Sequence, residues 1–268
     1  MLLQQKNAVI FGAGGSLGSG VARALAAQGA RVFLSGLHLH TVLPVADSII
    51  KDGGKAEAAQ VDAMDKNAID DYVKAVVQKA GSIDIVFNAI GVQDKQGMAL
   101  TEMLPEDFLR PISIAMQTQF LTGTAAARIM QQQHSGVILS LSSTPGTMSY
   151  AMTGGFGPVC CAIESLSRNL AAELGVYGIR VVCIRSAGSP DSNPFLNAMR
   201  NDPEGTAAFI KKLEDDTMLK QLPMVADIAN VAAFLASDHA SGITGVTIDV
   251  TCGTTSGLNY KMPAITFA

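Results

Sequence analysis

Apolar residues along this chain form short, mostly unbroken runs that alternate with amphipathic segments. Runs of this length, bounded by turn-forming residues, are typical of strands that a sheet buries on both faces. We predict strands at about 8–11, 30–35, 55–61, 83–87, 136–141, 179–184 and 246–250. Helical spacing predicts helices at about 17–25, 41–51, 65–77, 105–132, 158–174 and 227–235. This alternation predicts an α/β fold, a doubly wound, mostly parallel seven-stranded sheet with helices on both faces.

A glycine-rich stretch, residues 12–20, joins the first predicted strand to the first predicted helix. A strand that turns sharply into a helix needs a residue free to take positive φ. It also needs missing side chains where backbone N–H groups approach an anion. The position at the first strand favours a phosphate cradle over the alternative, a glycine-rich turn that binds no ligand.

The length of 268 residues and the 48% hydrophobic content fit one core, and we expect a single domain over 1–268. The net charge of −4, without a basic block, argues against a nucleic-acid partner. No apolar run reaches the ~18 residues of a membrane helix, and the first residues lack the features of a signal peptide. We therefore expect a cytoplasmic protein with no membrane partner.

One segment, about 186–223, interrupts the alternation between the sixth strand and the last helix. It is rich in Asp, Asn, Pro and Gly and contains one predicted polar helix at about 204–216. Ligands of doubly wound sheets bind beyond the carboxyl ends of the strands. The segment is therefore either a substrate lid or a solvated surface loop.

The cysteines and histidines do not predict a metal site. Cys160 and Cys161 are adjacent and cannot both face one site, and Cys183 and Cys252 stand far from them in the sequence. The four histidines are scattered as well. We assign no metal and expect most thiols to be free and buried.

Several stretches, in this order, resemble the short-chain dehydrogenase/reductase superfamily over essentially the whole chain. They are the glycine-rich loop 12–18 and the segments 61–63, 84–91, 140–143, 170–181 and 243–245. The resemblance implies a Rossmann-type NAD(P)-binding fold and a small-molecule substrate or metabolite. It also implies that the following residues hold the cofactor: Gly12, Gly15, Ser16, Leu17, Gly18, Leu37, Asp62, Ala63, Asn88, Ala89 and Gly91.

The residues that move the proton in this family are largely replaced here. Its members pair hydride transfer with a tyrosine, a lysine, a serine and an asparagine. The resemblance places the serine at Ser143, but the tyrosine, lysine and asparagine positions hold Phe156, Cys160 and Ala115. The wider tyrosine–lysine spacing of the superfamily's enoyl reductases is also absent, because no lysine lies between 95 and 211.

Three other polar residues are candidates near this site. The hydroxyl of Tyr150, seven residues after Ser143, could reach the substrate, although a loop tyrosine without a role is the alternative. Arg185 and Asp191, just beyond the sixth strand, either bind substrate or solvate the loop.

The sequence leaves the cofactor and the activity open. The second strand ends in Ser35-Gly36-Leu37-His38 without an acidic residue, which favours NADP weakly over NAD. One hypothesis is an oxidoreductase that reduces a carbonyl or oxidises an alcohol with a non-standard proton donor. The alternative is a catalytically inactive homologue that binds a dinucleotide or metabolite or serves as a partner subunit. The resemblance also implies a homo-oligomer, a dimer or tetramer, through helices 105–132 and 158–174.

Overall fold

The computed structural model describes residues 1–256, and a seven-stranded sheet lies at its centre. All neighbouring strands are parallel, in the order β3-β2-β1-β4-β5-β6-β7. The strands are β1 (Asn7–Phe11), β2 (Arg31–Gly36), β3 (Lys55–Gln60), β4 (Ile85–Asn88), β5 (Gly136–Ser143), β6 (Ile179–Ser186) and β7 (Thr247–Val250). The order reverses between β1 and β4, which is where such sheets leave a crevice for a ligand.

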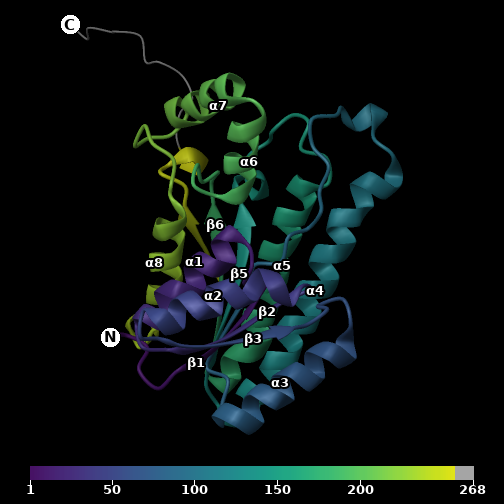
Figure 1. Cartoon of the computed structure of the whole chain (residues 1–268). Helices are drawn as coiled ribbons and strands as arrows, with labels where there is room; N and C mark the ends of the chain where they lie inside the picture. Colours follow the sequence, from purple (N-terminus) through teal and green to yellow (C-terminus); the bar gives the residue numbers. More distant parts are fainter. Residues whose placement is uncertain (257–268) are drawn as a thin grey trace, which may run out of the picture.

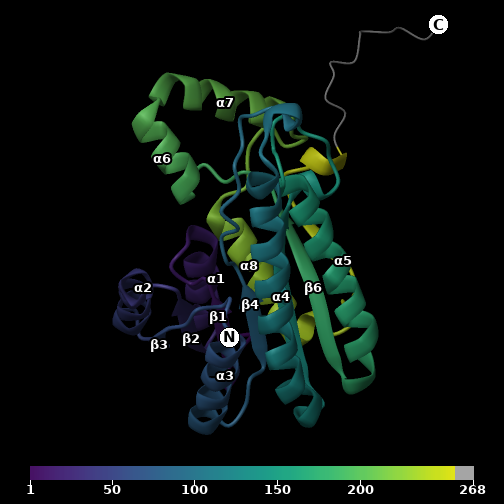
Figure 2. The ribbon, with the colours of Figure 1, turned by 90° about the vertical axis from the view of Figure 1, so that its right-hand side faces the viewer.

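Helices cover both faces of the sheet (Figure 1). On one face lie α1 (Ser16–Ala27), α2 (Leu39–Lys51) and α8 (Val225–Ala236). On the other lie α3 (Lys66–Ala80), α4 (Pro105–Gln133) and α5 (Phe156–Leu174), as the side view shows (Figure 2). The strand residues alternate between two apolar cores, because Ile10 faces α1 and α8 whereas Val9 and Phe11 face α3 and α4.

The predicted fold class is therefore confirmed, and all seven predicted strands are present. The segment after β6 differs in detail, because it contains two helices where one was predicted. These are α6 (Asn193–Asn201) and α7 (Pro203–Asp215), which lie beyond the carboxyl end of the sheet (Figure 1). Asp202 separates them: its side chain accepts the Gly205 N–H and caps α7, and Pro203 occupies the first turn of α7.

The strand register brings four strand ends to one edge. Phe11 is paired with Asn88, Asn88 with Ser140, and Ser143 with Ser186. The residues that follow β1, β4, β5 and β6 therefore surround one space. Within residues 1–256, no helix is both long enough and apolar enough to cross a membrane.

Candidate active site

A cavity of about 570 Å³ lies at the carboxyl ends of β1, β4, β5 and β6. The first turn of α1 borders it, as do the segment after β4, the end of β5, the start of α5 and the start of α6. It is lined by Gly15, Ser16, Leu17, Gly18, Asn88, Ala89, Ile90, Gly91, Val92, Asp94, Gln96, Gln119, Leu141, Ser142, Ser143, Phe156, Val159, Cys160, Ile163, Ser186, Ala187, Gly188, Ser189, Ser192, Asn193, Pro194 and Phe195.

The glycine-rich loop requires glycine at two positions for steric reasons. Gly12 has φ +78°, and a Cβ there would lie 2.6 Å from the Ala89 carbonyl oxygen. A Cβ on Gly18 would lie 2.3 Å from the Gly12 carbonyl oxygen. Gly15 is different, because a Cβ there meets only ordinary contact at 3.6 Å and would point into open space beside the cavity.

Two observations show that this end of the cavity fits the phosphates of a dinucleotide. Gly15 is the N-cap of α1 and no side chain hydrogen-bonds there, so the first-turn N–H groups have no side-chain cap. Across the cavity, the Ser189 hydroxyl is buried and has no hydrogen-bond partner. Such a group is expected to find its partner in a ligand or a water molecule.

Ser16, at the family's middle-glycine position, connects the loop to the segment after β6. Its Oγ accepts a hydrogen bond from the Asn193 backbone N–H at 2.7 Å. Asn193 is the first residue of α6. The start of α6 is therefore bound directly to the start of α1.

The predicted cofactor residues divide into two groups. Seven of them line the cavity: Gly15, Ser16, Leu17, Gly18, Asn88, Ala89 and Gly91. Gly12 shapes the loop from beneath, and Leu37, Asp62 and Ala63 follow β2 and β3 outside the cavity wall. The Leu37 side chain is exposed, and the Asp62 carboxylate accepts the Met64 N–H at 2.9 Å.

Asn88 is held rigidly at the end of β4. Its side chain is 2% exposed, its Nδ2 donates to the Thr122 hydroxyl at 2.9 Å, and its Oδ1 accepts the Ile90 N–H at 3.1 Å. This pair of bonds fixes the turn from β4 into the cavity wall.

An apolar wall stands at the positions that the resemblance assigns to the family's proton-transfer residues. Phe156 and Cys160 both line the cavity. Behind them Ala115, 1% exposed, packs in a cluster with Val159, Ile163 and Cys183. Burial, together with the nearby Glu164 charge, raises the pKa of the Cys160 thiol to about 12. This thiol is therefore neutral at physiological pH and supplies neither a cation nor a thiolate.

The hydroxyls at the end of β5 donate their protons to the protein. Ser143 Oγ donates to the Ser186 carbonyl oxygen at 3.0 Å. Ser142 Oγ donates to Glu164 Oε1 at 2.8 Å. A hydroxyl has only one proton to donate, so in this arrangement both serines offer the cavity lone pairs only.

Tyr150 is not among the residues that line the cavity. Its hydroxyl lies 3.6 Å from the Met148 sulfur. The structure thus brings Ser143, Phe156 and Cys160 to the cavity, whereas it places Tyr150 in the neighbouring loop.

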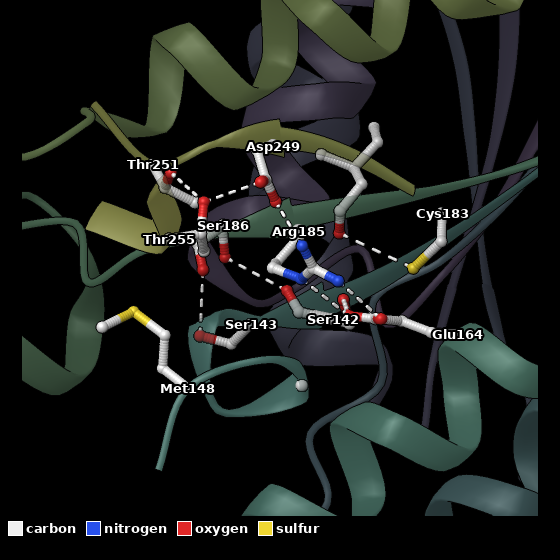
Figure 3. A network of polar contacts seen from close by, with 12 residues as sticks. Ser142, Ser143, Met148, Glu164, Cys183, Arg185, Ser186, Asp249, Thr251 and Thr255 are labelled. Carbon is white, nitrogen blue, oxygen red and sulfur yellow. Dashed lines mark hydrogen bonds and ion pairs between the residues drawn. The ribbon is translucent and has the colours of Figure 1, made fainter. Parts of the chain in front are cut away.

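A charged network beneath the site was not predicted as a unit. Figure 3 shows Arg185 between Glu164 and Asp249, with Ser142 and Ser143 beside them. The Arg185 Nε and Nη2 bind the two carboxylate oxygens of Glu164 at 2.8 and 2.7 Å, and Nη1 binds Asp249 Oδ1 at 2.7 Å. Glu164 is 4% exposed, and these bonds raise the pKa of Arg185 above its ordinary value.

The sequence did contain a signal for this network. Arg185 stands in a mostly apolar strand and Glu164 in a helix with few charged residues, and such charges are rarely buried unless paired. Arg185, one of the polar candidates named from the sequence, therefore uses its guanidinium group in this network.

Asp191, the other candidate after β6, binds the protein as well. Its carboxylate accepts the Val225 N–H at the start of α8, at 3.0 and 3.2 Å.

Comparisons with known proteins agree with this architecture. A family model described as enoyl-(acyl carrier protein) reductase matches residues 12–255. An oxidoreductase of Bacillus subtilis strain 168, YxbG, is 30% identical over 91% of this chain and 88% of its own length. The L-rhamnose 1-dehydrogenase (NAD(P)(+)) of Azotobacter vinelandii is 30% identical over 94% of this chain and 98% of its own length.

A solved structure gives the same result in three dimensions. The crystal structure of a levodione reductase superposes with a TM-score of 0.88 at 26% identity, over 95% of this chain and 99% of that one. Levodione reductase of Leifsonia aquatica is 28% identical over 91% of this chain and 92% of its own length. The chain belongs to the short-chain dehydrogenase/reductase superfamily of oxidoreductases.

Proposed function

We propose that the protein is an NAD(P)-dependent oxidoreductase that acts on a small molecule held at the end of β5. The observation that carries this proposal is the single cavity that runs from the uncapped start of α1 to Ser143 and Phe156. One end has the features of a dinucleotide cradle and the other borders the family's reaction centre. The dinucleotide, when bound, supplies or accepts a hydride.

The chain's own residues would share the work as follows. Gly15, Leu17 and the first-turn N–H groups of α1 would hold the phosphates, and Asn88 with Gly91 would border the rest of the cofactor. Leu37, Asp62 and Ala63 would border its adenosine part outside the cavity. No carboxylate stands at the end of β2 to repel a 2′-phosphate, so we propose a slight preference for NADP(H).

Carbonyl reduction or alcohol oxidation at this site would need a proton donor other than tyrosine. Phe156 has no ionisable proton. The pKa of the Cys160 thiol is about 12, so this thiol does not release its proton at neutral pH. The remaining sources are solvent water and Ser143, after rotation of its hydroxyl away from Ser186. General acid catalysis by a positioned group is worth roughly 10²–10⁴-fold, so the wild-type protein is expected to be slow on ketones.

A second candidate function is dinucleotide or metabolite binding without turnover. The apolar cluster of Ala115, Val159, Ile163 and Cys183 favours it, because Ala115 stands where the resemblance places the family's asparagine. The two candidates share the cofactor site and differ only in hydride transfer.

Both candidate functions require the cofactor site. Titration of the protein with NADPH and NADH, monitored by nicotinamide fluorescence, tests this site. Gly15→Val fills the cradle from a position whose φ of −77° suits any residue, so we expect affinity to fall by at least about tenfold while the protein stays folded. Gly175→Val is the matched control, because that glycine has negative φ and no neighbour within 4 Å and does not line the cavity. Equal affinity in all three proteins would contradict the proposed site.

Oxidation of the bound NADPH or NADH across a panel of carbonyl and imine compounds then separates the candidates. Turnover of any compound supports the oxidoreductase. Tight binding with no turnover supports the binding protein.

We further propose that α6 and α7 form a substrate lid over this cavity. The residues at the start of α6 line the cavity, namely Ser192, Asn193, Pro194 and Phe195.

We also propose that the chain forms a homo-oligomer through α4 and α5. The apolar side chains of Leu109 and Phe120 are exposed on α4. Light scattering at micromolar concentration tests the assembly, and a monomeric mass would contradict it.

A further inference from the structure

The lining of the cavity has an unusual polarity. Among the lining residues of the described chain, no lysine, arginine or histidine occurs, and Asp94 is the one acidic residue. Its Oδ2 accepts a hydrogen bond from the neutral Gln96 amide at 2.5 Å. The nearest cation in sequence, the Lys95 ammonium, is paired with Asp107 Oδ2 at 2.6 Å instead.

The hydroxyls at the reaction centre have the same polarity. Ser143 and Ser142 donate to the Ser186 carbonyl and to Glu164, so these hydroxyls have only lone pairs left for a ligand. A carbonyl substrate develops negative charge on oxygen during hydride addition and needs donors there. Beside the unpartnered Ser189 hydroxyl, the cavity lining thus presents acceptors at Ser142 and Ser143 and one carboxylate, which suit positive charge.

We infer that the substrate is a nitrogen cation, namely an iminium ion, which is reduced to the neutral amine. Within the proposed function, this class also explains the missing proton donor. Hydride addition to an iminium carbon forms one C–H bond, breaks the C–H bond of the hydride donor and moves the C=N π pair onto nitrogen. The product is a neutral amine, so no proton is consumed at the site. Addition to a ketone leaves an alkoxide that must be protonated.

Phe156 and Cys160 would then keep positive charge of the protein away from a cationic substrate. A tyrosine–lysine pair would place an ammonium ion beside the substrate and repel a cation. Phenylalanine and a neutral thiol remove that charge and leave an apolar wall, which also strengthens the attraction between the substrate and Asp94. The aromatic face of Phe156 adds a further surface that attracts cations.

Binding, measured apart from turnover, tests this inference. Isothermal titration of the NADP⁺-loaded protein compares N-methylpyrrolidine, which is protonated and cationic at pH 7, with cyclopentanone, its neutral analogue. We expect the cation to bind at least about tenfold more tightly, the scale of a partly desolvated charge pair. Equal binding, or tighter binding of the ketone, would overturn the inference whether or not the protein turns over any substrate.

Asp94→Asn should remove most of this preference and leave the affinity for NADP⁺ unchanged. Asp71→Asn is the matched control, because Asp71 is an exposed carboxylate on α3 that pairs with Lys74. It removes the same net charge and should leave the preference intact. A preference that survives in Asp94→Asn would overturn the assignment of Asp94.

Turnover provides the second measurement. With NADPH, kcat/KM for N-methylpyrrolinium should exceed that for cyclopentanone by about 100-fold, the lower range of what a missing general acid costs. Faster turnover of the ketone would contradict the inference but would keep the proposed oxidoreductase. Failure to bind NADP⁺ or NADPH would instead count against the proposed function itself.

Discussion

The two ends of the cavity differ in how far they match the family that the chain resembles. At the cofactor end, the loop and Asn88 keep the geometry that the family's resemblance implies: positive φ at Gly12, close approach at Gly18 and an uncapped α1. At the reaction end, the positions that the resemblance assigns to the family's tyrosine, lysine and asparagine hold Phe156, Cys160 and Ala115. A site of this kind can retain its cofactor while changing what it does with the proton.

A buried ion pair lies behind the reaction end. The Glu164–Arg185 pair contacts Ser142 and joins α5 to the ends of β5, β6 and β7. The apolar surface faces the cavity and the charge lies behind it.

Restoring the family's residues should produce the largest effect. In Phe156→Tyr/Cys160→Lys, a hydroxyl and an ammonium return beside Ser143, and ketone reduction should rise by about 100-fold or more. Steady-state oxidation of NADPH with a panel of ketones measures this. Phe156→Leu/Cys160→Met changes the same positions without an ionisable group and should gain nothing. An inactive restored variant that still binds NADPH would mean that the reaction end is remodelled more deeply than these positions.

Removing the cation of the buried pair should have the largest effect on stability, as restoring the family's residues has on activity. Arg185→Met leaves the Glu164 carboxylate without its bidentate partner, and we expect a loss of about 3–5 kcal/mol in unfolding free energy. Urea denaturation measures it. The double variant Glu164→Leu/Arg185→Met should lose clearly less, and Asp249→Asn, at a half-exposed site, only about 0–1 kcal/mol. Equal losses in the single and double variants would contradict a coupled pair.

Alkaline pH should destabilise the protein through Cys160. Its pKa is about 12 in the folded state against 9.0 for an ordinary thiol, so below pH 9 both states keep the proton and stability is complete. Above pH 9 the unfolded thiol ionises first, and stability falls by about 1.4 kcal/mol per pH unit until the folded thiol ionises too. Cys160→Ala should show a shallower decline between pH 9 and 10.5, as measured by denaturation at each pH. Parallel declines would refute the assignment.

The smallest effect should come from the bond between the loop and α6. Ser16→Ala removes the acceptor of the Asn193 N–H. The free energy that holds the start of α6 in place should fall by about 1 kcal/mol. Hydrogen exchange at Asn193 should therefore become several-fold faster in the free protein. Ser19→Ala is the control, because Ser19 Oγ bonds to the Ser16 carbonyl oxygen and does not touch Asn193. Unchanged exchange in Ser16→Ala would show that other contacts hold the start of α6.

The fold could be predicted from the sequence because the apolar runs and helical spacings of single segments agree with the alternation of strands and helices along the chain. The short apolar run that ends at Phe87 was predicted as a strand from the alternation along the chain, and it forms β4. The helix predicted at about 65–77 is present as α3, and the Asp65 carboxylate caps its start. The glycine-rich loop was equally readable, since only glycine satisfies the conformation of Gly12 and the close approach at Gly18.

The rest of the site depends on contacts between distant residues. The Arg185–Glu164–Asp249 network joins positions 64 and 21 residues apart, and no local pattern pairs them. The bond from Asn193 to Ser16 spans 177 residues. Whether a serine hydroxyl faces the cavity as donor or as acceptor depends on its neighbours in the fold, as Ser143 and Ser186 show.

The isotope dependence of hydride transfer tests the central claim most directly, namely that this site transfers a hydride without a proton from the protein. Single-turnover oxidation of NADPH by N-methylpyrrolinium should slow when the transferred hydrogen is deuterium. It should be unchanged in D₂O and flat with pH between 6 and 8. A rate that falls in D₂O and follows a titration across that range would contradict the account, because a protein group would then be donating the proton.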